Sequence, residues 1–142
     1  MKTNVLLAVV VATLSGFILG WLVFGIMLDS FYKANMTPFT GLTKDPPSFI
    51  GIFIANIFWG VLLVLIYEKW AGIKSFGQGF IWGLVIYFLI VGGFDILMWG
   101  LMNLFNFQLV MVDVIANAVV GGLVGGATGL VLGMGKPKPV AG

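Results

Sequence analysis

The sequence predicts an all-α membrane protein, a bundle of four transmembrane helices whose fourth helix is rich in glycine. The first observation behind this prediction is composition, since 61% of the residues are hydrophobic, only 8% are charged, and the mean hydropathy is +1.15. A soluble domain of 142 residues does not need so much apolar surface, so lipid is the expected solvent. The length leaves no room for a second domain, and residues 1–142 are expected to form a single transmembrane domain.

The second observation is a row of small residues near the end of the chain. Reading every fourth position from residue 113 gives Asp113, Asn117, Gly121, Gly125, Gly129 and Gly133. Residues four apart share one face of a helix, so these positions form a ridge. Each glycine costs a helix in water about 1 kcal/mol relative to alanine. In a bilayer such a ridge instead lets another helix approach closely, in the manner of a glycine zipper.

Two further rows of small residues support the same interpretation. Gly122 and Gly126 continue a second row that starts at Ala118, and Gly16 and Gly20 lie four residues apart in the first apolar segment. All of these glycines are therefore expected to be helix-packing positions.

The apolar segments and their boundaries predict four helices, at about residues 5–31, 49–67, 76–101 and 112–134. The start of the chain resembles a secretory signal, but its apolar run of about 24 residues spans about 36 Å as a helix. It is therefore interpreted as an uncleaved first span. Residues 135–142 follow the fourth helix as a basic tail.

The breaks between these helices also carry local signals. Residues 34–47 form the one long loop, where Asp45 before Pro46 is typical of a helix start. Gly92 and Gly93 interrupt the third helix, where a kink is expected. Residues 103–108 form the last turn.

The lysines predict the orientation in the membrane. With four spans both termini lie on one side, and five of the seven lysines belong to that side, namely Lys2, Lys69, Lys74, Lys136 and Lys138. Lys33 and Lys44 belong to the opposite side. The positive-inside rule then places both termini in the cytoplasm, and a bacterial inner membrane is the expected location.

Missing residue types exclude several kinds of chemistry. The sequence contains no Cys, no His and no Arg. Disulfides, thiol catalysis, a Ser-His-Asp triad and nearly all zinc chemistry are thereby excluded. Because the lysines are scattered, no nucleic-acid partner is expected. No cofactor is expected, and no nucleophile–base pair indicates an enzyme.

One constellation of polar residues lies at membrane depth. Counting about 1.5 Å per residue from the expected helix ends places Asn56, Asp95 and Asn117 at a similar level. Asp29 and Asp113 are expected at the mouth above them.

Two interpretations of this constellation are open. Carboxylates inside a membrane often mark ion pathways, and two carboxylates with two amides could hold a proton or a hard cation. The alternative is structural, with Asp95 bonded to Asn117 across an interface and Asp113 acting as a helix N-cap. Four aromatic residues, Trp21, Trp59, Trp82 and Tyr87, could line an apolar cavity, although such residues more often only pack.

Two stretches carry a resemblance to known proteins. Residues 12–32, ATLSGFILGWLVFGIMLDSFY, combine a Gly-x-x-x-Gly with aromatics near the helix exit, and residues 103–133, NLFNFQLVMVDVIANAVVGGLVGGATGLVLG, end in the glycine rows. Together they cover about half the chain and resemble families of small uncharacterised four-helix bacterial membrane proteins, of the domain of unknown function type. The resemblance implies a topology and no activity.

These observations lead to two functional hypotheses. The first is a non-enzymatic membrane protein that works by assembly, as a homo-oligomer or as a small subunit of a membrane complex, because the glycine ridge exceeds what four short helices need internally. Its partners are then the lipid bilayer and a second copy or another membrane protein. The alternative is a small cation- or proton-linked transporter or channel that uses Asp95 and Asp113.

The lysine distribution generates the first testable prediction. A reporter fused after Gly142 should lie in the cytoplasm, and an epitope inserted in the loop at residues 34–47 should be accessible from outside intact cells. Both are measured by protease or label access before and after permeabilisation. A reporter found outside would reverse the assignment of the two membrane faces.

Overall fold

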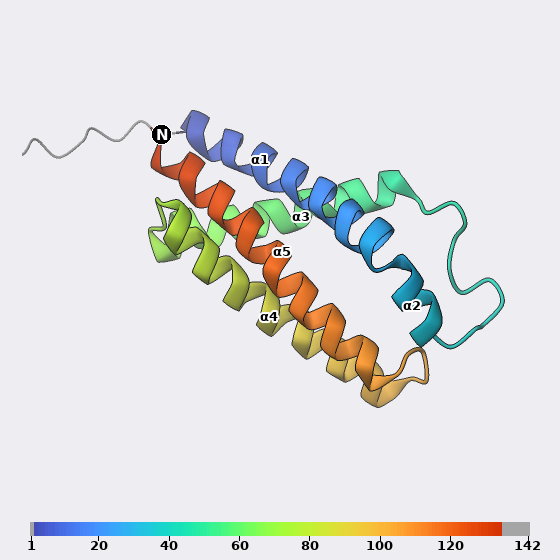
Figure 1. The fold of residues 1–142 in the computed structure, drawn as a ribbon. Coiled ribbons are helices and arrows are strands. Elements are labelled where there is room, and N and C mark those ends of the chain that lie inside the picture. Colours follow the sequence, from blue (N-terminus) through green and yellow to red (C-terminus); the bar gives the residue numbers. More distant parts are fainter. Residues whose placement is uncertain (1, 135–142) are drawn as a thin grey trace, which may run out of the picture.

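The protein is described here by a computed structural model, which covers residues 2–134. The described part of the chain contains the helices α1 (Lys2–Gly20), α2 (Asp29–Asn35), α3 (Phe49–Leu65), α4 (Phe76–Leu101) and α5 (Phe107–Gly133). Two π-helical segments, η1 (Trp21–Met27) and η2 (Ile66–Ala71), continue α1 and α3 (Figure 1). The tail predicted at residues 135–142 lies outside the described residues.

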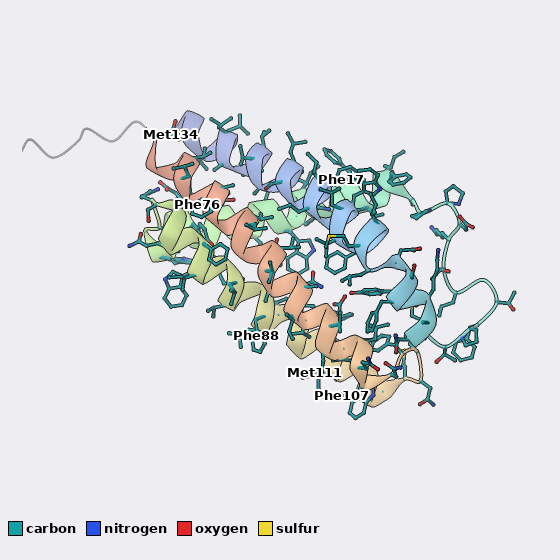
Figure 2. All side chains as sticks on the ribbon, in the orientation of Figure 1. Phe17, Phe76, Phe88, Phe107, Met111 and Met134 are labelled. Carbon is teal, nitrogen blue, oxygen red and sulfur yellow. The ribbon has the colours of Figure 1, made fainter. Side chains whose placement is uncertain are left out.

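Four of the helical stretches are long and apolar enough to cross a membrane. They are Asn4–Met27, Phe49–Ala71, Phe76–Leu101 and Phe107–Gly133, which is compatible with an integral membrane protein. Many large apolar side chains point outward from the helices, as Phe88 and Met111 do in Figure 2. Such a surface suits contact with hydrocarbon, since every span satisfies its backbone hydrogen bonds internally.

The first and last spans differ from their predicted bounds. The first span, expected to run to residue 31, ends at Met27. The Leu28 N–H donates to the carbonyl of Val23, five residues back, and α2 then begins as a separate helix. Helix α5 begins at Phe107 instead of residue 112, because the Asn106 side chain accepts from the Leu109 N–H at 2.9 Å and caps the helix.

Two local features in the middle of the chain can be compared with the sequence. Ser48 caps α3 by accepting from the Gly51 N–H, so the expectation of a helix start at Asp45 and Pro46 was wrong. Helix α4 is continuous from Phe76 to Leu101, so Gly92 and Gly93 do not interrupt it. A Cβ on Gly92 would be 3.3 Å from Val114 of α5.

The helices pack in a definite order. In Figure 1 helix α5 lies between α1 and α4, and α3 runs behind α1 and α5, in contact with α1. The buried core gathers near the end of the molecule that holds the start of α1 and the end of α5, here called the terminal end. Its buried members include Ala12, Leu63, Tyr67, Val124 and Leu132. The opposite end, which holds the loop at residues 36–48 and the turn at residues 102–106, is called the loop end.

Glycines on both helices set the register of the α4–α5 pair. A Cβ on Gly83 would lie 3.0 Å from the Cα of Gly125 and still closer to the carbonyl of Gly121. One turn toward the terminal end, a Cβ on Gly79 would lie 3.2 Å from the Cα of Gly129. The two backbones are therefore in direct contact, which only glycine permits at these positions.

The remaining glycines of α5 are also covered by this chain. The ring of Tyr87 lies on Gly121, the ring of Phe80 on Gly122 and the ring of Phe76 on Gly126, and the carbonyl of Lys74 lies against Gly133. Both small rows of α5 are thus occupied within one chain. The glycines of α5 that suggested assembly are therefore not free to contact a partner protein.

The glycines of the first span behave differently from each other. A Cβ on Gly16 would lie 2.6 Å from the side-chain oxygen of Asn56, so Gly16 is a contact between α1 and α3. Gly20 has nothing within 4 Å of its Cβ position. Gly20 therefore packs against no neighbouring helix, contrary to the prediction, and it lines the cavity described below.

Polar contacts fasten the two ends. At the loop end, the N–H of Thr37 donates to the carbonyl of Leu104 at 2.8 Å, and the Asn106 amide donates to Asn35 Oδ1 at 2.6 Å. These bonds attach α2 to the α4–α5 turn. At the terminal end, the Tyr67 hydroxyl donates to the carbonyl of Gly79, and Lys74 forms an ion pair with Glu68.

The glycine contacts generate a matched pair of substitutions on one helix. Gly83→Ala should lower the free energy of unfolding by about 1–3 kcal/mol, because the new methyl group meets backbone atoms that cannot move aside. Gly93→Ala should change it by less than about 0.5 kcal/mol, since nothing lies within 4 Å of that position. Thermal unfolding of both variants in nanodiscs measures the difference. Equal effects of the two substitutions would contradict the backbone contact.

Candidate functional site: a cavity beside a carboxyl pair

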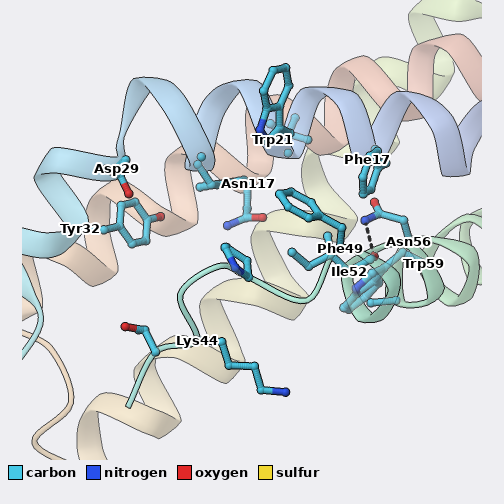
Figure 3. A pocket seen from close by; sticks show the side chains of 18 of the residues that line it. Phe17, Trp21, Asp29, Tyr32, Lys44, Phe49, Ile52, Asn56, Trp59 and Asn117 are labelled. Carbon is cyan, nitrogen blue, oxygen red and sulfur yellow. Dashed lines mark hydrogen bonds between the residues drawn. The ribbon is translucent and has the colours of Figure 1, made fainter. Parts of the chain in front are cut away.

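A cavity of about 880 Å³ opens between the helices at the loop end (Figure 3). Its walls come from the α1–η1 stretch, α2, the first half of α3 and the facing sides of α4 and α5, and the loop at residues 36–47 contributes Met36, Thr43, Lys44, Asp45 and Pro47. The volume falls within the range of about 300–1,000 Å³ typical of small-molecule sites.

The cavity exists because α3 leaves the bundle as it approaches the loop end. The buried residues of α3 are Gly60, Leu63 and Val64, all in its second half. Its first half keeps contact with α1 through the edge-to-face pair of Phe53 with Phe17, whose ring centroids are 5.6 Å apart. Helix α3 therefore follows α1 and diverges from the α4–α5 pair.

Aromatic rings form much of the wall. Trp59 of α3 and Tyr87 of α4 both line the cavity, and their ring centroids are 6.0 Å apart. Trp21 and Phe24 reach it from η1, where the wider π-helical turn changes which side chains face inward. Trp82, the fourth candidate from the sequence, does not line the cavity and is 52% exposed.

Behind the wall lies a cluster of four polar side chains. The Tyr32 hydroxyl donates to Oδ1 of Asp113. The Asn117 amide donates to Oδ2 of the same carboxylate at 2.8 Å and to the Asp113 carbonyl at 3.0 Å. Tyr32 and Asn117 also line the cavity, so they separate it from Asp113.

Asp95 completes the cluster from α4. Its side chain interacts with that of Asp113 and, over a longer range, with Tyr32. Its Oδ2 atom is buried and has no hydrogen-bond partner among the described residues. A buried hydrogen-bond acceptor without a donor is energetically costly. The side chain that interacts with Asp95 is a second acceptor, the Asp113 carboxylate.

The register of α4 and α5 accounts for this meeting. Asp95 lies three helical steps of four residues beyond Gly83, and Asp113 lies three such steps before Gly125. The glycine contact therefore places the two aspartates opposite each other. Both lie six residues from their helix ends, Leu101 and Phe107, at a depth of about 9 Å.

This depth corrects part of the predicted constellation. With α5 starting at Phe107, Asn117 lies one turn deeper than Asp95, and Asp113 is the residue at its level. Asp113 is not an N-cap, because it lies in the second turn of the helix. Asn117 binds Asp113 rather than Asp95.

Asn56 and Asp29 line the cavity at other places. The Asn56 amide donates to the Ile52 carbonyl of its own helix at 2.9 Å, and its oxygen faces Gly16. Asp29 pairs with Lys33 at 2.7 Å on the exposed side of α2. Neither residue contacts the carboxyl pair.

Tyr32 is the member of the cluster that sequence reasoning missed. In the sequence Tyr32 is only one of the aromatics near the helix exit, yet its hydroxyl reaches Asp113 of α5. Burial raises the pKa of Tyr32 above its usual range, and the bond to Asp113 raises it further. Tyr32 therefore stays a neutral donor at any physiological pH.

The donor set also limits the metals that the site could hold. No group of three or more His, Cys, Asp or Glu side chains comes together in the part of the chain that the structure describes. The pair has only two carboxylates, with Asn117 and Tyr32 directed at one of them. It suits a proton or a single weakly held cation better than a tightly bound divalent ion.

Comparisons with known proteins identify no relative. No family model matches the chain, and no curated protein and no solved structure matches it. The resemblance to small four-helix bacterial families therefore stays an expectation, and the function must be argued from the site.

The cluster generates a double-mutant cycle. Tyr32→Phe and Asp113→Asn should show a coupling energy of about 1 kcal/mol or more, because the first removes the donor and the second removes the charge of the acceptor in the same hydrogen bond. Tyr32→Phe and Asn56→Ala share no partner and should be additive within about 0.5 kcal/mol. Unfolding by SDS in mixed micelles gives the free energies. Additivity in the first cycle would mean that Tyr32 does not hold Asp113.

Proposed function

We propose that this protein is a small proton- or cation-linked transporter with four transmembrane spans, in which Asp95 and Asp113 carry the proton or the cation. The single observation behind the proposal is the pair of carboxyl groups from two helices, one turn from the wall of a large cavity. Intramembrane carboxylates that face each other are expensive unless they hold something between them.

The chemistry of the pair supports a bound proton. Two ionised carboxylates offer only acceptors and repel each other at short range. One shared proton turns one group into a donor to the other and gives the buried Oδ2 atom of Asp95 a role. A monovalent cation could take the proton's place by accepting oxygen ligands from both sides.

The surroundings allow exchange with the cavity. Tyr32 and Asn117 donate to Asp113 and at the same time line the cavity, so a ligand that attracts either one weakens a bond to the carboxylate. A change in those bonds alters how strongly the pair holds its proton. Binding in the cavity and proton binding are linked in this way.

The other titratable groups around the cavity come from several elements. Helix α2 contributes Tyr32, Asp29 and Lys33, and helix α4 contributes Tyr87 on the same face as Asp95. The loop contributes Lys44 and Asp45 at the cavity. The facing part of α1 and η1 carries no ionisable side chain.

The geometry favours this function over assembly, the leading hypothesis from the sequence. Assembly was motivated by spare glycines, and both glycine rows of α5 are in contact with the same chain. In the proposed arrangement the four spans form one bundle in a bacterial inner membrane with both termini in the cytoplasm. The loop end and its cavity then face outward, and no reaction is catalysed.

Stability as a function of pH tests the proposal. A proton held by the folded pair and released from the unfolded chain means that the folded state binds more protons, so stability should fall as pH rises. The melting temperature of the wild type should therefore decrease from pH 5 to pH 8. Asp95→Asn should remove this slope, because its amide donates to Asp113 permanently.

Matched conditions make the result specific. Asp29→Asn removes an exposed carboxylate beside the same cavity and should keep the wild-type slope. Na⁺, K⁺, Mg²⁺ or Ca²⁺ should raise the wild-type melting temperature at pH 8 if a cation replaces the proton, following RT ln(1 + [L]/Kd). Superimposable wild-type and Asp95→Asn curves under all conditions would rule out the proposed role of the pair.

A further inference from the structure

The chemistry of the cavity narrows the class of substrate that the proposed transporter binds. The two side-chain amides that line the cavity use their N–H groups elsewhere. Asn117 donates to the carbonyl and the carboxylate of Asp113, and Asn56 donates to the carbonyl of Ile52. The oxygen of Asn56 faces Gly16, which leaves the oxygen of Asn117 as the amide acceptor for a ligand.

The charges around the cavity also favour a cationic ligand. The charged groups that line the cavity are two lysines and two acids, Lys33 and Lys44 with Asp29 and Asp45, which balance each other. Lys33 is held by Asp29 at 2.7 Å. The carboxyl pair one layer behind the wall is therefore the unbalanced charge, and it makes the interior negative whenever the pair is not doubly protonated.

The walls favour a cation with a large apolar body. Four aromatic residues from three different elements line the cavity, namely Trp21, Phe24, Trp59 and Tyr87. Indole and phenol faces attract cations, most strongly where water is excluded. An inorganic ion would leave most of a cavity of about 880 Å³ unfilled.

We propose that this cavity binds lipophilic organic cations, such as quaternary ammonium or phosphonium compounds with aromatic or alkyl substituents. The cationic centre sits between the aromatic rings and the oxygen of Asn117, and the substituents pack against the apolar wall. This assignment rests on the proposed function, in which the cation displaces the proton of the Asp95–Asp113 pair.

Two ions of matched shape and opposite charge test it. Tetraphenylphosphonium and tetraphenylborate are titrated into wild-type protein in nanodiscs, with empty nanodiscs as the blank for partition into lipid. Saturable binding is measured by calorimetry at pH 6 and pH 8. The expected result is saturable binding of tetraphenylphosphonium alone, tighter at pH 8 because the proton no longer competes.

Variants locate the site. Trp59→Leu should weaken tetraphenylphosphonium binding roughly tenfold through loss of a cation–π surface. Trp82→Leu is the matched control, because Trp82 is exposed and does not line the cavity, and its binding should equal that of the wild type. Equal losses in both variants, or none in either, would place binding elsewhere and overturn the assignment.

The remaining outcomes separate the ligand class from the proton link. Saturable binding of both ions, with displacement of both by added phospholipid, would show an apolar lipid-chain site and overturn the assignment. No binding of either ion, together with a pH slope that Asp95→Asn removes, would overturn the ligand class and leave the proposed function. Selective but pH-independent phosphonium binding, unchanged in Asp95→Asn, would support the cation site and overturn the proton link.

Discussion

Backbone contact between α4 and α5 is the constraint on which the rest of the structure depends. Gly79 and Gly83 meet Gly125 and Gly129 with no side chain between them. The rings of Tyr87 and Phe80, which lie on Gly121 and Gly122, fix the register of this contact. The same register aligns Asp95 with Asp113. Packing between the two backbones thus positions the carboxyl pair about three turns away.

The molecule divides into a filled half and a hollow half. Near the terminal end, Leu63, Val64 and Tyr67 of the α3–η2 stretch pack against Val124 of α5. Toward the loop end, α3 stays with α1 and the space beside α5 becomes the cavity. Hydrogen bonds from Thr37 and Asn106 then hold α2 to the α4–α5 turn, so the cavity has a fixed wall on that side.

The sequence was sufficient for the spans and insufficient for the cluster. Hydropathy located the four apolar helices, since their length and composition are local properties. The start of α5 was missed because the cap at Asn106 was read as part of a polar turn, and that error of five residues put Asn117 instead of Asp113 level with Asp95. The spacing of Gly79 and Gly83, four residues apart, could have indicated that α4 packs on the glycine ridge of α5. The position of Tyr32 in the cluster could not be predicted from the sequence, because it depends on the break at Leu28 that redirects α2.

The position of α5 in the chain, after the helices that it contacts, has a consequence for biosynthesis. Helix α5 supplies the partner of α4 and also packs against α1. Chains are made from the N-terminus, so α1, α3 and α4 are synthesised before the helix that joins them. Until α5 is made, Gly79 and Gly83 lack the backbone that they contact, and Asp95 has no carboxyl neighbour. Synthesis of α5 therefore completes the α4–α5 hairpin, the core and the acidic pair in one step.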